Sequence, residues 1–72
     1  MVQQEQIVTG KEFKLYVKNG VYPISFSGTV VILDSVMKQS DSVLYKFSIR
    51  NNNIVLVNSK EYGASWYLEN VA

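Results

Sequence analysis

Apolar and polar residues alternate along two segments of the chain. In residues 13–18, Phe, Leu and Val alternate with Lys, Tyr and Lys, and residues 43–50 follow a similar pattern. A period of two is typical of β-strands that bury one face. Alanine occurs only at Ala64 and Ala72, and no window repeats apolar residues at helical spacing. The pattern therefore predicts an all-β protein.

The dipeptide Asn19-Gly20 predicts the first hairpin, because these residues readily adopt the positive φ angles of a type I′ turn. A two-residue loop here fixes which residues of the two strands face each other. It opposes Phe13 to Phe26, Leu15 to Ile24 and Val17 to Tyr22. Three apolar pairs on one side favour this register. Pro23 has no N–H for the ladder, which predicts an edge position, a bulge or a longer loop there.

A second turn is predicted at residues 38–41, where the sequence reads Lys-Gln-Ser-Asp. The resulting register opposes Val30 to Ile49, Ile32 to Phe47, Asp34 to Tyr45 and Val36 to Val43. The even-numbered side of the second strand then forms its buried face, with Ile24, Phe26, Val30, Ile32 and Val36. Gly28 interrupts this strand and predicts a bulge or the bend at a barrel corner.

Three asparagines at residues 51–53 predict a third turn, since asparagine tolerates the left-handed conformation. Two loop lengths fit the sequence. The preferred two-residue loop pairs Ile49 with Ile54 and Phe47 with Leu56. A three-residue loop shifts the register by one position, which turns Val55 and Val57 toward the core instead.

A last strand over residues 65–71 completes a five-stranded antiparallel meander. Left flat, such a sheet would expose two edges and one apolar face, so the last strand is expected to return to the first. This closure favours a small, partly open barrel. Its order and length resemble SH3-like barrels, but the acidic, Tyr-rich first loop and the mid-chain Trp pair of peptide-binding SH3 domains are missing. We expect an N-terminal arm or short extra strand at residues 1–10 and one barrel domain at residues 11–72.

The composition excludes several kinds of chemistry. Without Cys and His, the chain lacks thiolate nucleophiles, disulfides, the commonest zinc ligands and the commonest general base. Its acids lack calcium-loop spacing, and its four glycines are scattered singly. Asp34 on an apolar face would fit a carboxyl of raised pKa, but the preferred interpretation places it in water at the end of its strand. We predict no catalytic residue, no metal site, no cofactor and no enzymatic activity.

Charge and hydropathy bear on location and partners. Seven basic and six acidic residues give a net charge of +1, which does not favour duplex DNA or an anionic membrane. The longest apolar run, residues 30–33, is too short to span a bilayer, and the first ten residues lack the features of a secretory signal. These features predict a cytoplasmic protein without a membrane partner. The Lys-, Asn- and Ile-leaning composition favours a bacterial or phage source, which suggests an inhibitor or accessory factor of a phage or mobile element.

The predicted register leaves five aliphatic side chains outside the core on three adjacent strands: Val31, Leu33, Leu44, Val55 and Val57. Such a patch favours a contact surface for another protein or for a second copy of the chain. Tyr67 joins it as an exposed aromatic residue, since Trp66 and Leu68 are expected to face the core. The alternative is a second small core, formed by coiling of the sheet or by the segment Gln6-Ile7-Val8 folding over these residues.

A basic and aromatic strand face supports a different function. Lys14, Tyr16 and Lys18 share one side of the first strand, and Lys46 and Arg50 extend it from the third. Such residues stack bases and bind phosphates in single-stranded nucleic-acid binding modules. The low net charge and the single stacking residue weigh against this alternative, so protein binding or self-association is the leading hypothesis.

Overall fold

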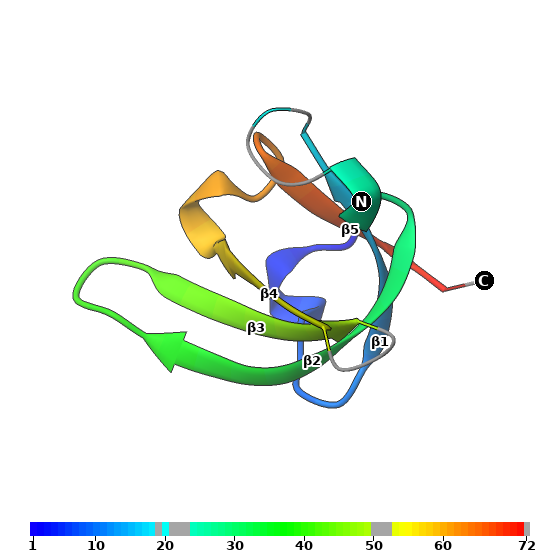
Figure 1. Ribbon diagram of the computed structural model, residues 1–72. Coiled ribbons are helices and arrows are strands. Elements are labelled where there is room, and N and C mark those ends of the chain that lie inside the picture. The colour runs from blue at the N-terminus through cyan, green and yellow to red at the C-terminus, as the bar shows by residue number, and fades with distance from the viewer. Residues whose placement is uncertain (19, 21–23, 50–52, 72) are drawn as a thin grey trace.

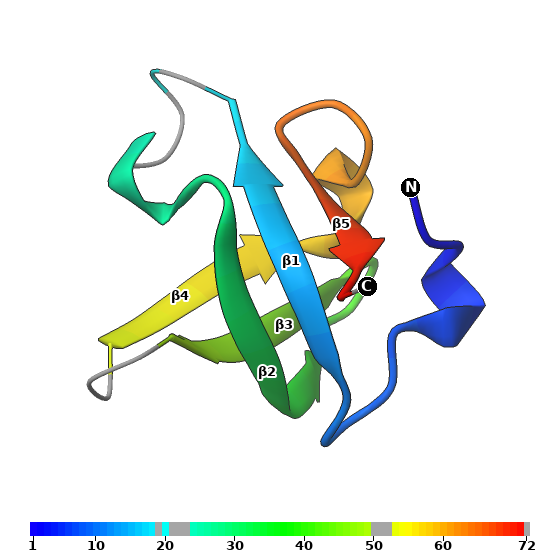
Figure 2. The ribbon, with the colours of Figure 1, turned by 90° about the vertical axis from the view of Figure 1, so that its right-hand side faces the viewer.

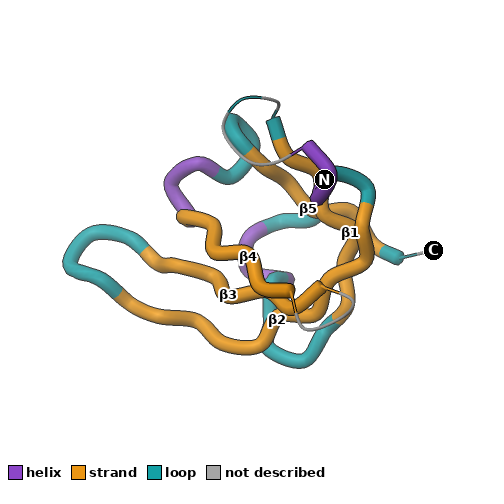
Figure 3. The backbone as a smooth tube through the Cα atoms, viewed as in Figure 1, coloured by secondary structure: helices purple, strands orange, loops and turns teal. Residues whose placement is uncertain are grey.

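The computed structural model describes residues 1–18, 20, 24–49 and 53–71 (Figure 1). These residues form five strands and three short 3₁₀ helices (Figure 3). The strands are β1 (Glu12–Val17), β2 (Thr29–Lys38), β3 (Val43–Ile49), β4 (Asn53–Asn58) and β5 (Trp66–Asn70). The 3₁₀ helices are η1 (Gln4–Gln6), η2 (Ile24–Phe26) and η4 (Ser59–Glu61). The all-β prediction is confirmed. Within the described ranges, no helix has the length and hydropathy needed to cross a membrane.

All five strands belong to one antiparallel sheet with the order β4-β3-β2-β1-β5. β5 returns to β1, where Leu15 pairs with Leu68 and Val17 with Trp66. The sheet coils without pairing β4 to β5, and η4 connects these two edge strands (Figure 2). The predicted partly open, SH3-like barrel is confirmed.

The predicted pairing of the first hairpin is wrong. Phe13 pairs with Val31, and Leu15 pairs with Thr29. η2 lies in the connection, and β2 begins only after Gly28, whose N–H donates to the Leu15 carbonyl at 2.6 Å. The facing residues of the second strand are thus five positions later than expected, and this odd shift exchanges the two faces of the strand. Asn19 of the predicted turn, and Tyr22 and Pro23 of the strand predicted to follow it, lie outside the described residues.

The second and third hairpins also differ from the preferred registers. Leu33, not Ile32, pairs with Phe47, and a bulge between Leu33 and Ser35 shifts the ladder at Asp34. The sequence did not predict this bulge, and the predicted pairing of Asp34 with Tyr45 is wrong because Tyr45 pairs with Val36. Gly28 lies in the turn that leads into β2, with a φ of +84°, which agrees with the bend predicted there. Phe47 pairs with Val55 on β4, so the register that turns Val55 inward is the correct one.

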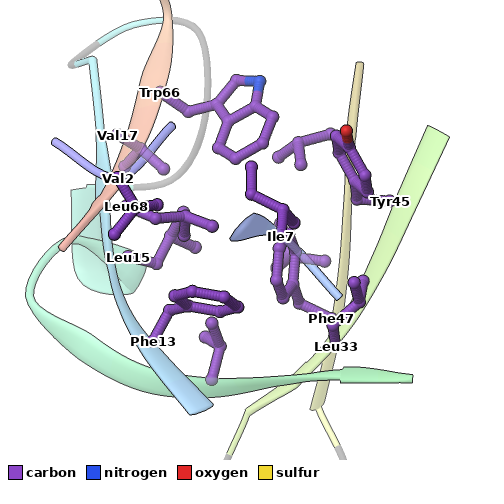
Figure 4. Close-up of a cluster of buried hydrophobic side chains, with 13 residues drawn as sticks. Val2, Ile7, Phe13, Leu15, Val17, Leu33, Tyr45, Phe47, Trp66 and Leu68 are labelled. Carbon is purple, nitrogen blue, oxygen red and sulfur yellow. The ribbon is translucent and has the colours of Figure 1, made fainter. Parts of the chain in front are cut away.

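The barrel interior is filled by large apolar side chains from all five strands and from the N-terminal residues (Figure 4). The buried set is Val2, Ile7, Phe13, Leu15, Val17, Val31, Leu33, Tyr45, Phe47, Val55, Val57, Trp66 and Leu68. Trp66 packs edge-on against Tyr45 and Phe47, with ring centroids 5.8 Å and 6.1 Å away. Its indole N–H donates to the Asn58 carbonyl at 2.8 Å, so burial leaves this donor satisfied.

The core positions predicted for the first and last strands are confirmed. Those predicted at Val30, Ile32 and Val36 are wrong, because all three are exposed.

The N-terminal segment closes part of the barrel. The Val2 N–H donates to the Leu68 carbonyl at 3.0 Å, and the Val2 carbonyl accepts a hydrogen bond from the Tyr62 hydroxyl. Further along, the Gly10 N–H donates to the Leu33 carbonyl at 2.8 Å. Ile7 projects into the interior between the side chains of β1 and β3 (Figure 4). Backbone hydrogen bonds therefore hold the segment at both ends, while its apolar side chains complete the core.

Candidate protein-interaction surface

Four of the residues predicted to form a contact surface are core residues. Val31 and Leu33 on β2 are completely buried, and Val55 and Val57 on β4 are buried against the same interior. Their predicted exposure is wrong because the ladders of β2 and β4 are displaced by an odd number of positions. These side chains are therefore unavailable for contact on the folded chain.

The same displacement places a different set of apolar residues outside the barrel. Between 41% and 50% of the surface remains exposed at Val30, Ile32, Met37, Ile54 and Leu56. Leu44 pairs with Met37 and is half-buried. We call these six residues the apolar outer face. It extends over the neighbouring strands β2, β3 and β4, and Leu44 is its only member that was predicted to be an interface residue.

A signal for this face is present in the sequence. Residues 30–33 and 54–57 are unbroken apolar runs, which are typical of strands covered on both faces rather than on one. In the monomer, β2 and β4 are covered on their inner faces only. A run that is apolar on both faces does not indicate which face lies in the core, so the predicted orientation of these strands depends on the turns alone.

Polar residues lie among and around the apolar side chains. Ser48 lies between Ile32 and Ile54 on the neighbouring strands, and its hydroxyl donates to the Asp34 carboxylate. Lys46 lies between Ser35 and Leu56. An open groove lies at this end of the face and is lined by Glu12, Gly28, Thr29, Val30, Ile32, Ser48 and Ile49.

The charges near this face have no ion-pair partner among the described residues. The salt bridges among the described residues join the Met1 amino group to Glu69 and Lys60 to Asp41, which lies in the turn beyond the end of the β2–β3 ladder. Neither of them involves Asp34 or Lys46. A surface with an apolar centre and charged borders is the usual anatomy of a protein interface.

The residues of the predicted nucleic-acid face are only partly brought together. Lys14 and Lys18 are exposed on one side of β1, and Tyr16 between them is half-buried. Lys46 lies on β3, from which β1 is separated by β2, and Arg50 lies outside the described residues. Sequence reasoning did not foresee that Tyr67 on β5 would stack on Tyr16, with ring centroids 5.0 Å apart and planes 15° apart. The two-tyrosine platform is bordered by Glu69, which is the partner of Lys14 in the ladder.

The titratable groups near the core have a structural role. Burial raises the pKa of Tyr45 and, as the largest of several effects, that of Tyr62. Both hydroxyls are therefore protonated at neutral pH, and that of Tyr62 donates a hydrogen bond to the backbone. Asp34 is exposed, as the preferred interpretation expected, but it lies at the bulge within β2 and not at the end of the strand, which continues to Lys38. Across the described ranges, no three Asp or Glu residues gather in a way that would hold a metal ion.

Comparison of the chain with models of protein families, with curated proteins and with solved structures gives no match. The fold class is therefore known from the structure itself. An SH3-like barrel carries many unrelated functions, so the argument for function depends on the surface of this chain.

Proposed function

We propose that this protein is a non-enzymatic binding module that contacts another protein, or a second copy of itself, through the apolar outer face. The observation that carries the proposal is the exposure of large aliphatic side chains on three adjacent strands. Single exposed apolar residues are common on soluble proteins, but a group of them gathered on one face of adjacent strands marks an interaction site. The open groove and the charged border add shape and polar complementarity.

The expected affinity follows from the exposed area. Complete burial of an aliphatic side chain stabilises by about 1.5–3 kcal/mol, so covering the exposed half of one contributes about 1 kcal/mol. Five such residues contribute roughly 5 kcal/mol before the cost of association, which is of similar size. Additional polar contacts from the border are therefore needed, and a reversible complex is expected rather than a permanent one.

A photo-reactive amino acid placed at Ser48, in the middle of the face, tests the proposal in the native host. We expect a discrete crosslinked protein, either a copy of the chain or another species, that disappears when Ile54→Lys is added. The same photo-reactive residue at Ser25, exposed on η2, is the matched control. Equal products at both positions, or products at Ser48 that persist in Ile54→Lys, would contradict the proposal.

The stacked Tyr16 and Tyr67 support a second candidate function, the binding of single-stranded nucleic acid. Two adjacent aromatic rings beside Lys14 and Lys18 provide more stacking surface than the sequence alone suggested. Fluorescence anisotropy of short labelled oligonucleotides at low salt tests this function. Binding should weaken as salt rises and should be lost in Tyr67→Ala. Absence of binding at low salt removes the candidate.

A further inference from the structure

We infer that the apolar outer face binds a second copy of this chain, with the β2–β3 ladders of the two copies packed face to face across a two-fold axis. This inference depends on the proposed function and specifies its partner. It is carried by the outward-facing cross-strand pairs of that ladder. They are Ile32 with Ser48, the bulged Asp34 and Ser35 with Lys46, and Met37 with Leu44.

In a two-fold arrangement, these cross-strand pairs determine which residues of the two copies meet. When the axis runs parallel to the strands, between β2 and β3, the β2 of each copy lies against the β3 of the other. Each residue then faces the counterpart of its own cross-strand neighbour. An interface of this isologous kind is stable only when those neighbours are complementary to each other. All three pairs meet this condition, in shape, in charge or in hydrophobicity.

The first and last pairs are complementary in shape and in hydrophobicity. Ile32 is large and exposed, whereas its neighbour Ser48 is small, and both line the open groove. Each Ile32 side chain would therefore enter the groove beside Ser48 of the second copy, as side chains interdigitate between packed sheets. At the other end, Met37 would cover Leu44 of the second copy, which gives two apolar contacts related by the axis.

The middle pair is complementary in charge. Asp34 projects toward the outer side, where it accepts the Ser48 hydroxyl, and Lys46 lies opposite the bulge. Neither forms an ion pair within the described part of the chain. In the two-fold arrangement each Lys46 meets Asp34 of the second copy, so two ion pairs form at once. Such pairs contribute to the choice of register and partner more than to raw affinity.

The shape of the molecule allows this approach. β2 runs well past the end of β1, because its pairing with β1 ends at Ile32 whereas its pairing with β3 continues to Lys38 (Figure 1). Val36 and Met37 in this extension of β2 are exposed. The ladder is therefore accessible along its length to another copy.

Charge-reversal variants test the inference, with molecular mass followed by sedimentation over a concentration series. The unaltered protein should form dimers. Lys46→Asp and Asp34→Lys should each weaken dimerisation by about tenfold or more, because each places two like-charged pairs in the interface. Mixing the two variants should restore the dimer, since both ion pairs re-form between unlike copies. Lys18→Glu, which reverses an exposed charge at the end of β1 and outside the ladder, is the control and should leave dimerisation unchanged.

Two results overturn the inference. A chain that stays monomeric at all concentrations has no self-association to explain, and variants that do not restore each other on mixing lack the two-fold pairing. Thermal unfolding of each variant verifies that the fold persists. If the chain is monomeric while Ser48 still crosslinks to a different protein in an Ile54-dependent manner, the inference fails and the proposed function stands. If neither dimer nor crosslink is found, both fail.

Discussion

Truncation of Leu33 and of its neighbour Ile32 should affect stability very differently. Leu33 is 0% exposed and pairs with Phe47 in the barrel, whereas Ile32 is 41% exposed on the outer face. Leu33→Ala removes three buried carbon atoms, worth about 2.4 kcal/mol in transfer free energy, and the remaining cavity adds about 1 kcal/mol. Ile32→Ala removes the same number of carbons, but only three-fifths of that surface is covered and no closed cavity remains. We expect a loss of roughly 3.5 kcal/mol for Leu33→Ala and roughly 1.4 kcal/mol for Ile32→Ala.

The difference of about 2 kcal/mol is large for a chain of 72 residues, whose total stability should be about 4–11 kcal/mol. Urea unfolding measures it, with fluorescence of the buried Trp66 as the signal. The protein concentration must be low enough that the chain is monomeric, since dimerisation would add to the stability contributed by Ile32. Val57→Ala and Leu56→Ala form a second matched pair on β4, buried and exposed respectively.

Equal losses for Leu33→Ala and Ile32→Ala, or a larger loss for Ile32→Ala, would refute the β2 register described above. The same outcome would also remove the apolar outer face, because Ile32 would then belong to the interior.

Three further predictions concern other parts of the fold. Ile7→Ala should destabilise the chain by about 2–4 kcal/mol in urea unfolding, because the N-terminal segment supplies this residue to the core; a loss below 0.5 kcal/mol would contradict that placement. Gly28→Ala should lower stability by about 1–2 kcal/mol, since φ is +84° there and no neighbouring atom restricts the space, so the change tests backbone strain alone. Burial raises the pKa of Tyr45 and Tyr62 above that of the unfolded chain, so stability present below about pH 10 should be lost as pH rises beyond it. Tyr45→Phe should reduce that alkaline loss, and an unchanged pH profile of the unfolding midpoint would argue against the burial of this hydroxyl.

The sequence predicts the strands more reliably than the pairing between them. Alternation alone was enough to place Phe13, Leu15 and Phe47 inside, because a one-sided pattern determines which face of its own strand is apolar. β2 and β4 have apolar residues on both faces, so local pattern cannot distinguish their two sides. Their orientation had to come from the turns, and Asn19-Gly20 supplied a register that the folded chain does not use.

A local feature of the sequence contradicts that register. Pro23 cannot donate to a ladder, and the structure begins β2 only at Thr29, after η2. The bulge at Asp34 had no comparable signal, since neither glycine nor proline marks it. The bulge allows the Leu33 and Phe47 pair to pack in the interior on one side of it and Tyr45 to pack there on the other side. A single strand does not show that both must face the interior, so the sequence of β2 alone does not predict the bulge.

The pairing of β1 with β5 has a consequence for synthesis in the cell. β1 is synthesised before the other strands, whereas its neighbour β5, with the core residues Trp66 and Leu68, follows only after β2, β3 and β4. The growing chain therefore exposes one edge of β1 and an unfilled interior until β5 has been added. Folding must bring together two distant parts of the chain, and contacts of that kind make small β-proteins fold in milliseconds to seconds rather than microseconds.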